Sequence, residues 1–377
     1  MTDGCTVEDI AAALPYLKLL YRVHLGACTP EELTAALALL PEGLADYSIA
    51  IFGREVTPDT KVLDLTEAES PAPEQLAAAL PYLPELETVL LGEREDPALA
   101  AAFRAAAPEI DVSCQYHFTY LGQELTESTE TLDLTKIQIT DVDELRRVLS
   151  WLPALTHTEM VGCGIDDETM AALRDEFPEK GIVWEISLGF WGTVRTDATA
   201  FTTRSSRTEA EDKHRLTTET VQPIQYCTEL VALDLGHQHI GDISCLAGLH
   251  KLQILILADN WVSDLTPLTS MPDLIYLELF INRITDVTPL AELKNLKDLN
   301  ICTNHISDLT PFYSMTSLER LYYSNNDFTR EDHEALQAAL PNCVCDRTVW
   351  DETAHGWREH ERYFWMRSFF QDCPRYK

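Results

Sequence analysis

Residues 274–290 read LIYLELFINRITDVTPL, and the same pattern returns every 22 residues along the second half of the chain. Within this copy, Leu277 and Leu279 have the spacing of a short strand that turns apolar side chains inward. One unit cannot bury these side chains alone, so the repeat predicts stacked coils around a continuous core. Five consecutive copies open in one register, at Leu230, Leu252, Leu274, Leu296 and Leu318.

The unit has the form L-x-x-L-x-L-x-x-N-x-L, which is the leucine-rich repeat pattern. Its 22-residue length and its D-[LIV]-[TS]-P-[LF] tail resemble the repeats of bacterial internalins, over residues 221–328. The resemblance implies a curved parallel sheet, short 3-10 segments on the convex side and a binding role. We therefore expect strands near residues 231–235, 253–257, 275–279, 297–301 and 319–323.

Two polar columns run through these repeats. An inward amide can bond the backbone of adjacent coils, and an Asp before a turn is a preferred helix cap. A ladder of metal ligands is the alternative interpretation of the carboxylate column. The amide column holds Gln238, Asn260, Asn282, Asn304 and Asn326. The carboxylate column holds Asp242, Asp264, Asp286 and Asp308.

A longer repeat of 69 residues occupies the first half, because VLDLT at residues 62–66 returns as TLDLT at residues 131–135. Each unit has the order strand, helix, strand, helix, strand. Its first two strand–helix pairs resemble the longer, helix-containing class of leucine-rich repeat. Alternating Tyr116, Phe118 and Tyr120 predict a half-buried β element that forms a hairpin with the residues that follow.

The first copy of the long repeat is incomplete. Thr6 and Asp9 have the spacing of a helix N-terminal cap, but the strand expected before Thr6 is absent. Two explanations stay open: the first helix is itself the cap of the solenoid, or upstream sequence is missing. Acidic residues stand where a signal peptide has basic ones, so the chain as given predicts a cytoplasmic location. Missing upstream sequence would make it a cell-surface or secreted protein.

The predicted fold class is α/β: a leucine-rich repeat solenoid with a curved parallel sheet, irregular helix-containing N-terminal repeats and a helical C-terminal cap. We expect one continuous curved body. In the cap, Trp357, Tyr363 and Phe369 are predicted to cover the open end of the fifth coil, with a partner-binding helix as the alternative. The predicted parts are residues 1–201 (irregular repeats, three copies of the 69-residue unit), 202–220 (polar loop or linker), 221–330 (internalin-like repeats) and 331–377 (cap).

The whole layout resembles a group of bacterial, mainly gut-Firmicute, leucine-rich repeat proteins. Two stretches that flank the repeats carry this resemblance: WGTVRTDATAF at residues 191–201 and GWRxHxRYxxMR at residues 356–367. The resemblance covers most of the chain and implies the fold, without a particular activity.

Composition excludes several partner classes. The 377 residues carry 62 acidic and 28 basic side chains, a net charge of −34. This charge repels nucleic-acid phosphates and anionic membrane surfaces. The sequence contains no apolar run as long as a membrane span.

Signatures of an enzyme, a cofactor or a metal site are missing from the sequence. It has no phosphate-binding Gly loop and no nucleophile elbow, so we expect no enzyme and no cofactor. A Cys–His arrangement stays open, since such partners meet only in space. Cys227 and Cys245 occupy core columns, and the Cys343–Cys345 pair lacks the second pair of a zinc site. His237 and His239 have divergent register positions, so no metal is expected there either.

Strand residues between the leucines should face the concave surface, where apolar and aromatic side chains are rimmed by acids. Exposed clusters of this kind usually mark interaction sites. The predicted function is therefore a non-enzymatic scaffold for a neutral or basic protein or peptide. A structural or self-associating module and a carbohydrate-binding surface protein are the alternatives, and the N-terminal half or another subunit could cover the patch. The oligomeric state stays open. The predicted partner-binding residues are Ile254, Ile256, Tyr276, Glu278, Phe280, Ile281, Asp298 and Tyr322.

Overall fold

A computed structural model describes residues 7–16, 19–94, 96–203, 208–348, 353 and 356–373. Thr6, the expected cap of the first helix, lies outside these residues. The chain divides into two compact units. Unit 1 comprises residues 1–132 and 139–158, and unit 2 comprises residues 133–138 and 159–377. This division falls inside the region that the sequence suggests as one set of irregular repeats.

Unit 1 alternates helices with short strands, as the long repeat predicts. Leu33, Leu76 and Phe103 lie on the inner faces of the helices and are fully buried against the strands. Its helices are α1 (Val7–Ala13), α2 (Pro30–Leu39), α3 (Pro73–Ala79), α4 (Pro97–Ala106) and α5 (Val142–Trp151), with 3-10 turns at Leu14–Tyr16 and Leu80–Tyr82. Its sheets are β1 (Val23–Cys28), β2 (Ala45–Ile51) and β3 (Arg54–Val56), then β4 (Val62–Asp64), β5 (Thr88–Glu93) and β6 (Asp111–Gln115).

The alternating aromatic stretch forms the expected hairpin. Strands β7 (His117–Tyr120) and β8 (Gln123–Thr126) pair in antiparallel fashion. Tyr116 and Tyr120 are buried, whereas Phe118 is half-buried with its ring 5.4 Å from that of Trp151, edge to face. The prediction of a half-buried β element is confirmed.

A second group of short elements precedes the regular repeats. A sheet has the strand order β11-β10-β9, and β12 pairs with β13 in antiparallel fashion. The strands are β9 (Thr131–Asp133), β10 (His157–Glu159), β11 (Ile182–Val183), β12 (Glu185–Ser187) and β13 (Thr193–Arg195). The helical segments are α6 (Asp167–Glu176), the 3-10 turns Pro178–Lys180 and Gly189–Trp191, and α7 (Glu209–Lys213).

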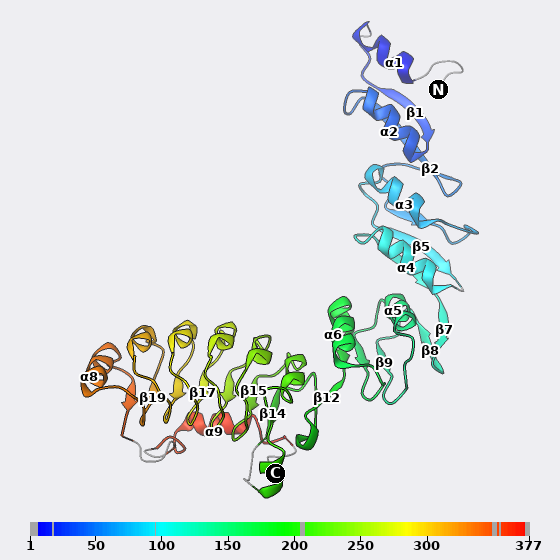
Figure 1. Ribbon diagram of the computed structural model, residues 1–377. Coiled ribbons are helices and arrows are strands. Elements are labelled where there is room, and N and C mark those ends of the chain that lie inside the picture. The colour runs from blue at the N-terminus through cyan, green and yellow to red at the C-terminus, as the bar shows by residue number, and fades with distance from the viewer. Residues whose placement is uncertain are drawn as a thin grey trace. The chain divides into compact units, whose positions relative to one another are not determined.

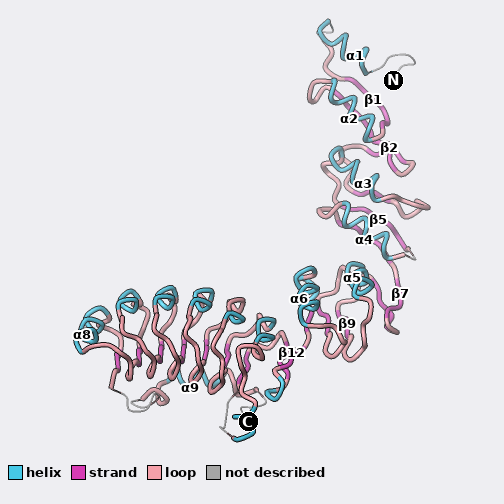
Figure 2. Tube along the Cα trace, in the orientation of Figure 1, coloured by secondary structure: helices cyan, strands magenta, loops and turns pink. Residues whose placement is uncertain are grey.

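The regular repeats form a seven-stranded parallel sheet within the described residues, in the order β14 to β20 (Figures 1 and 2). Its middle strands fall inside the five predicted segments, so the predicted register is confirmed. Turns of 3-10 helix line the convex side, at Gln222–Tyr226, Ser244–Leu246, Thr266–Ser270, Thr288–Glu292 and Thr310–Ser314. The strands are β14 (Ala200–Thr202), β15 (Ala232–Asp234), β16 (Ile254–Ile256), β17 (Tyr276–Glu278), β18 (Asp298–Asn300), β19 (Arg320–Tyr322) and β20 (Val344–Asp346).

The amide column ties neighbouring coils together. Asn282 Nδ2 donates to the carbonyl of Leu257 in the preceding coil at 2.9 Å, and its Oδ1 accepts from the N–H of Val262 at 2.9 Å. Asn260, Asn304 and Asn326 repeat this pattern. These bonds satisfy backbone groups that a turning chain would otherwise leave unpaired.

The carboxylate column caps the convex turns. Oδ1 of Asp286 accepts from the N–H of Thr288 at 2.8 Å, and hydrogen bonds from the side chain and the backbone of Thr288 lower the pKa of the carboxyl group. Asp242, Asp264 and Asp308 make the same contact with the residue two positions on. Each carboxylate therefore has a capping partner, which supports the capping interpretation over a metal ladder.

Both ends of the sheet extend beyond the five predicted coils. At the far end, α8 (Arg330–Ala339) and β20 add a further coil, with Cys345 opposite Leu321, and this is the helical cap. At the near end, β14 pairs with β15. Part of the segment expected as a polar linker is folded, because Leu216 is buried and its N–H donates to Gln238 at 2.8 Å. Among the described residues, no helix has the length and apolar character needed to cross a membrane.

Candidate binding surface on the concave face

The predicted binding residues lie together, as the repeat register requires. Parallel pairing sets Ile254, Tyr276 and Asp298 in one row across the sheet, and Ile256 and Glu278 in the next. Tyr322 continues the second row on β19. Phe280 and Ile281 follow β17, where Ile281 adopts a left-handed backbone with φ +55°. The repeat pattern thus correctly predicts one contiguous concave surface.

The prediction that this surface is exposed is wrong. Tyr276 and Asp298 have no exposed area, and Glu278 retains 6%. Ile254, Ile256, Phe280 and Tyr322 are also buried, and Ile281 is partly buried. The cover comes from the chain itself, from the C-terminal segment that was expected to close the end of the fifth coil.

Residues 356–373, here named the strap, lie across the concave face and contain α9 (Glu361–Ser368). In Figure 1, α9 runs along the side of the sheet opposite to the 3-10 turns. The strap and the sheet share a small core of their own, separate from the core inside the coils. Its strap members are Trp357, Met366, Phe370 and Cys373, and its sheet members include Ala232, Ile254, Ile256, Tyr276 and Tyr322.

Trp357 is the central contact of the strap and is fully buried. Its ring centroid lies 5.6 Å from that of Tyr276 and 4.9 Å from that of Tyr322. The guanidinium of Arg320 lies over the indole, 4.4 Å from the centroid. The indole N–H donates to Oε1 of Glu278 at 2.7 Å. Buried indoles usually find such a hydrogen-bond acceptor, so the floor of the face is built for this ring.

Ion pairs hold the middle of the strap. Arg362 Nε donates to Asp298 at 2.9 Å, and its terminal nitrogens donate to Glu319 at 2.7 Å. Arg320 Nε donates to the other oxygen of Asp298 at 3.0 Å, so this buried carboxylate is shared between two arginines. The bonds from Arg362 and Lys297 lower the pKa of Glu319 to about 2.

Glu278 is buried beneath the strap. Burial raises the pKa of this carboxyl group, while hydrogen bonds from Trp357 and from the hydroxyl of Tyr276 oppose the rise. Desolvation favours the neutral form of an acid, whereas donors favour the carboxylate. One of these donors, Tyr276, belongs to the sheet, and the other, Trp357, belongs to the strap. The strap position above Glu278 therefore favours a residue that can donate a hydrogen bond.

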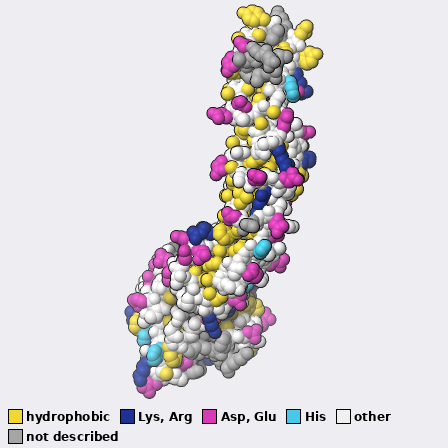
Figure 3. Space-filling view, turned by 90° about the vertical axis from the view of Figure 1, so that its right-hand side faces the viewer, with side chains coloured by type: hydrophobic (Ala, Val, Ile, Leu, Met, Phe, Trp, Pro, Cys, Tyr) yellow, Lys and Arg dark blue, Asp and Glu magenta, His cyan; other side chains and the backbone are white. Residues whose placement is uncertain are grey.

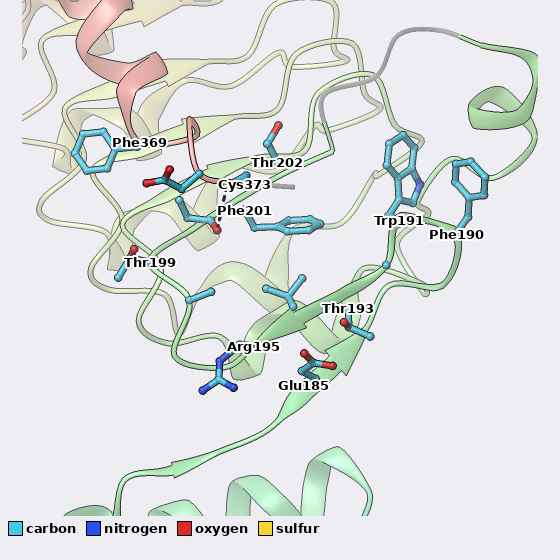
Figure 4. A pocket seen from close by; sticks show the side chains of 15 residues that line it. Glu185, Phe190, Trp191, Thr193, Arg195, Thr199, Phe201, Thr202, Phe369 and Cys373 are labelled. Atoms are coloured by element: carbon cyan, nitrogen blue, oxygen red, sulfur yellow. Dashed lines mark hydrogen bonds between the residues drawn. The ribbon is translucent and has the colours of Figure 1, made fainter. Parts of the chain in front are cut away.

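The strap ends beside β14, where a pocket of about 670 Å³ opens next to the β12–β13 hairpin (Figure 4). Sγ of Cys373 donates to the carbonyl of Ala200 at 3.5 Å and closes one wall. A smaller cavity of about 310 Å³ remains between the strap and β15–β17. The lining of the larger pocket includes Phe190, Trp191, Phe201, Phe369, Thr199 and Thr202.

The predicted role of the C-terminal aromatic residues needs a correction. Trp357, Tyr363 and Phe369 pack on the concave core and do not cover the end of the fifth coil, which α8 and β20 close instead. Apolar area alone did not distinguish these two sites in the sequence. The pairing of Arg362 with Asp298 and Glu319 does distinguish them, but it is visible only when both segments are placed in space.

The two histidines considered as metal ligands point to different partners. His237 Nδ1 lies 2.9 Å from Oδ2 of Asp259, whereas the ring of His239 stacks on that of Trp261 with centroids 4.4 Å apart. Over the described part of the chain, no three His, Cys, Asp or Glu side chains gather in a metal-binding group.

Comparison with known proteins finds one family match and several similar solved structures. The family of leucine rich repeats (2 copies) matches residues 272–314. Internalin C2 of Listeria monocytogenes is 24% identical with a TM-score of 0.32, over 44% of this chain and 81% of that structure. The internalin inlF of the same organism is 18% identical with a TM-score of 0.32, over 80% of this chain and 86% of that structure. A leucine-rich repeat protein of Leptospira interrogans is 15% identical with a TM-score of 0.32, over 88% of this chain and 90% of that structure.

At these values the fold assignment rests on the repeats of the chain itself. No curated protein matches the chain in sequence. The parallel strands in 22-residue register, the inward amide column and the family match at residues 272–314 identify this chain as a leucine-rich repeat protein.

Proposed function

We propose that this protein is a non-enzymatic scaffold that binds a protein or peptide on the concave face of the β14–β20 sheet. The strap is the observation that carries the proposal. It is a polypeptide segment already seated on that face, with Trp357 in the central position and Arg362 in the ion pairs. A partner segment with the same side chains would find the same contacts.

The chemistry of the face defines the partner class. Tyr276 and Tyr322 supply aromatic anchors, a kind of residue enriched among those that dominate binding energy at interfaces. Glu278 and Asp298 supply buried acceptors. Acidic side chains are spread over the surface in Figure 3, and the net charge is −34. This charge would speed the encounter with a basic partner. The partner we propose is a segment that carries a tryptophan and arginines.

Binding would require release of the strap. A tethered segment competes at a high effective concentration, so a free partner sees only the fraction of molecules whose face is open. The wild-type chain should therefore bind weakly. Variants that loosen the strap without altering the sheet should bind more tightly.

The test uses a fluorescent synthetic peptide of residues 356–373, titrated against full-length chains by anisotropy. Trp357→Ala loosens the strap and leaves the sheet unchanged, so this chain should bind the peptide at least about tenfold more tightly than wild type. Phe364→Ala is the matched control, because Phe364 is also a strap aromatic but is 57% exposed. It should bind like wild type.

The location of the peptide is checked with a second substitution. Adding Tyr322→Ala to the Trp357→Ala chain should weaken peptide binding by about 1–3 kcal/mol, the usual value of an aromatic anchor. A scrambled peptide of the same composition should not bind. The proposal is wrong if the Trp357→Ala chain shows no saturable binding, or if it binds the scrambled peptide equally well.

Two other functions give different results in the same system. A self-associating module would form dimers of the Trp357→Ala chain that light scattering detects and that the peptide does not dissociate. A carbohydrate-binding protein would retain defined ligands on a glycan array and ignore the peptide. Either result, without peptide binding, replaces the proposed function.

A further inference from the structure

Two cysteines differ from the rest in their exposure. Of the nine described cysteines, seven are buried, and only Cys343 and Cys345 are partly exposed. Cys5 lies outside the described residues. The two exceptions are two positions apart at the last strand of the sheet, where Cys345 belongs to β20 and Cys343 directly precedes it.

The backbone brings these two thiols together. Side chains two positions apart along a strand point to the same face. Cys345 lies opposite Leu321 of β19, which faces the core, and Cys343 stands two positions before it, in the bend that enters β20. The neighbouring Cys343 side chain lowers the pKa of Cys345, whereas Cys345 and burial raise the pKa of Cys343. Cys345 is thus the more acidic thiol of the two.

Buried cysteines of the repeats provide the contrast. Cys227 and Cys245 fill core columns, and burial raises the pKa of each thiol to about 12. Such thiols are not nucleophiles at neutral pH, because the thiolate is the reactive form. The difference arises from position, since β20 is the outermost strand in the sheet order.

We propose that Cys343 and Cys345 form a dithiol site that exchanges with small disulfides and closes to an internal Cys343–Cys345 disulfide. The Cys345 thiolate attacks one sulfur of the external disulfide and expels the first thiolate. Cys343 then loses its proton to that thiolate and attacks the Cys345 sulfur, which expels the second. The second thiolate takes up from water the proton that Cys345 released on ionising, so that overall the protein loses two electrons and two protons and the external disulfide becomes two thiols.

The geometry permits the closure. Two residues of a strand advance about 6.4–6.8 Å between Cα atoms, and disulfides span about 4.4–6.8 Å. Closing the bond therefore needs only a small approach of the two Cα atoms. Cys343 lies in a bend outside β20, and β20 has a neighbouring strand on one side only. Such a position can shift without breaking the ladder of the inner strands.

The test exposes the intact chain to cystamine under native conditions, blocks the remaining thiols with N-ethylmaleimide and maps each cysteine by peptide mass spectrometry. The cationic ends of cystamine suit a chain of net charge −34. The Cys343–Cys345 disulfide should form first, at least about tenfold faster than the reaction of any buried cysteine. Dithiothreitol should reverse it.

Three variants separate the roles of the two thiols. Cys343→Ser should retain cystamine on Cys345 as a lasting mixed disulfide, and Cys345→Ser should slow the reaction at Cys343. Val344→Ser is the matched control, because it changes the exposed residue between them and should react like wild type. Equal labelling of Cys343, Cys345 and the buried cysteines overturns the proposal. A mixed disulfide with cystamine that persists in the wild-type chain also overturns it. This second outcome does not depend on whether the variants fold.

Discussion

The indole N–H of Trp357 donates a 2.7 Å hydrogen bond to Oε1 of Glu278, a residue 79 positions earlier in the chain. Glu278 lies on β17 with its carboxylate turned to the concave side, where an unpaired buried acid would be costly. The strap supplies a donor in addition to the hydroxyl of Tyr276. This contact fixes the strap to the concave face of the sheet. It also identifies Trp357 as the residue whose removal should release the strap.

Trp357→Ala should destabilise the strap more than any other single substitution in it. Loss of a fully buried tryptophan costs about 3–5 kcal/mol, and Glu278 also loses a donor. Hydrogen exchange should show lost protection in α9, with β16–β18 protected as before. Phe364→Ala, at an exposed site, should change stability by less than about 0.5 kcal/mol. Equal protection of α9 in both variants would contradict the assignment of Trp357 as the anchor.

Asp298→Asn tests the buried ion pairs. Asp298 is fully buried and neutralises both Arg320 and Arg362, so its neutral isostere leaves two arginines without their shared partner. Breaking a buried pair in this way should lower the free energy of unfolding by about 3 kcal/mol, measured in urea. The control is Lys297→Met, which removes a half-exposed pair with Glu319 and should cost no more than about 1 kcal/mol. Similar losses in the two variants would refute the claim that burial sets the difference.

Acid should loosen the strap through Glu319. Its pKa falls from an ordinary 4.5 to about 2 in the folded chain, so the folded state holds this proton less tightly than the unfolded state. The resulting stabilisation is complete above about pH 4.5 and is lost as the pH falls towards 2. Because Glu319 is half-exposed, solvent keeps the effect modest.

The measurement is the urea concentration at which half of the hydrogen-exchange protection of α9 is lost, compared between about pH 4.5 and pH 2. Glu319→Gln should flatten the pH dependence in that window. Glu292→Gln, at an exposed position away from the strap, should leave it unchanged. A wild-type slope that survives in Glu319→Gln would assign the acid sensitivity to another group.

The repeats could be predicted because their signal is local and periodic. Each coil repeats its leucines and its inward amide, and the first four also repeat the capping Asp. The spacing of Leu277 and Asn282 is therefore enough to define the strand register. The shared face of Ile254, Tyr276 and Asp298 follows from that register. The hairpin after Tyr116 follows from alternation alone.

The cover over that face could not be predicted by the same reasoning. Trp357 and Tyr276 are distant in sequence, and no period links them. An aromatic residue near the end of the chain can pack on the last coil or on the concave face with similar apolar burial. What separates the two is polar pairing, Trp357 with Glu278 and Arg362 with Asp298, which needs the positions of both segments in space.

Thr303→Asn should stabilise the array. The residue before each column amide adopts a left-handed backbone, and Thr303 does so with φ +55°. A β-branched residue is strained there, at about 1–2 kcal/mol, whereas Asn tolerates it. The chain already has Asn325 at the equivalent position of the next coil, with φ +52°.

The free energy of unfolding should therefore rise by about 1 kcal/mol, measured in urea. The introduced amide also retains an oxygen that can accept the bond Asn325 Nδ2 now donates to Thr303 Oγ1 at 3.4 Å. Thr285→Asn is the control, since Thr285 is exposed and is not among the residues with positive φ in the described chain. It should change stability by less than about 0.5 kcal/mol. A loss of stability in Thr303→Asn would mean that packing of the threonine methyl group outweighs backbone strain at this turn.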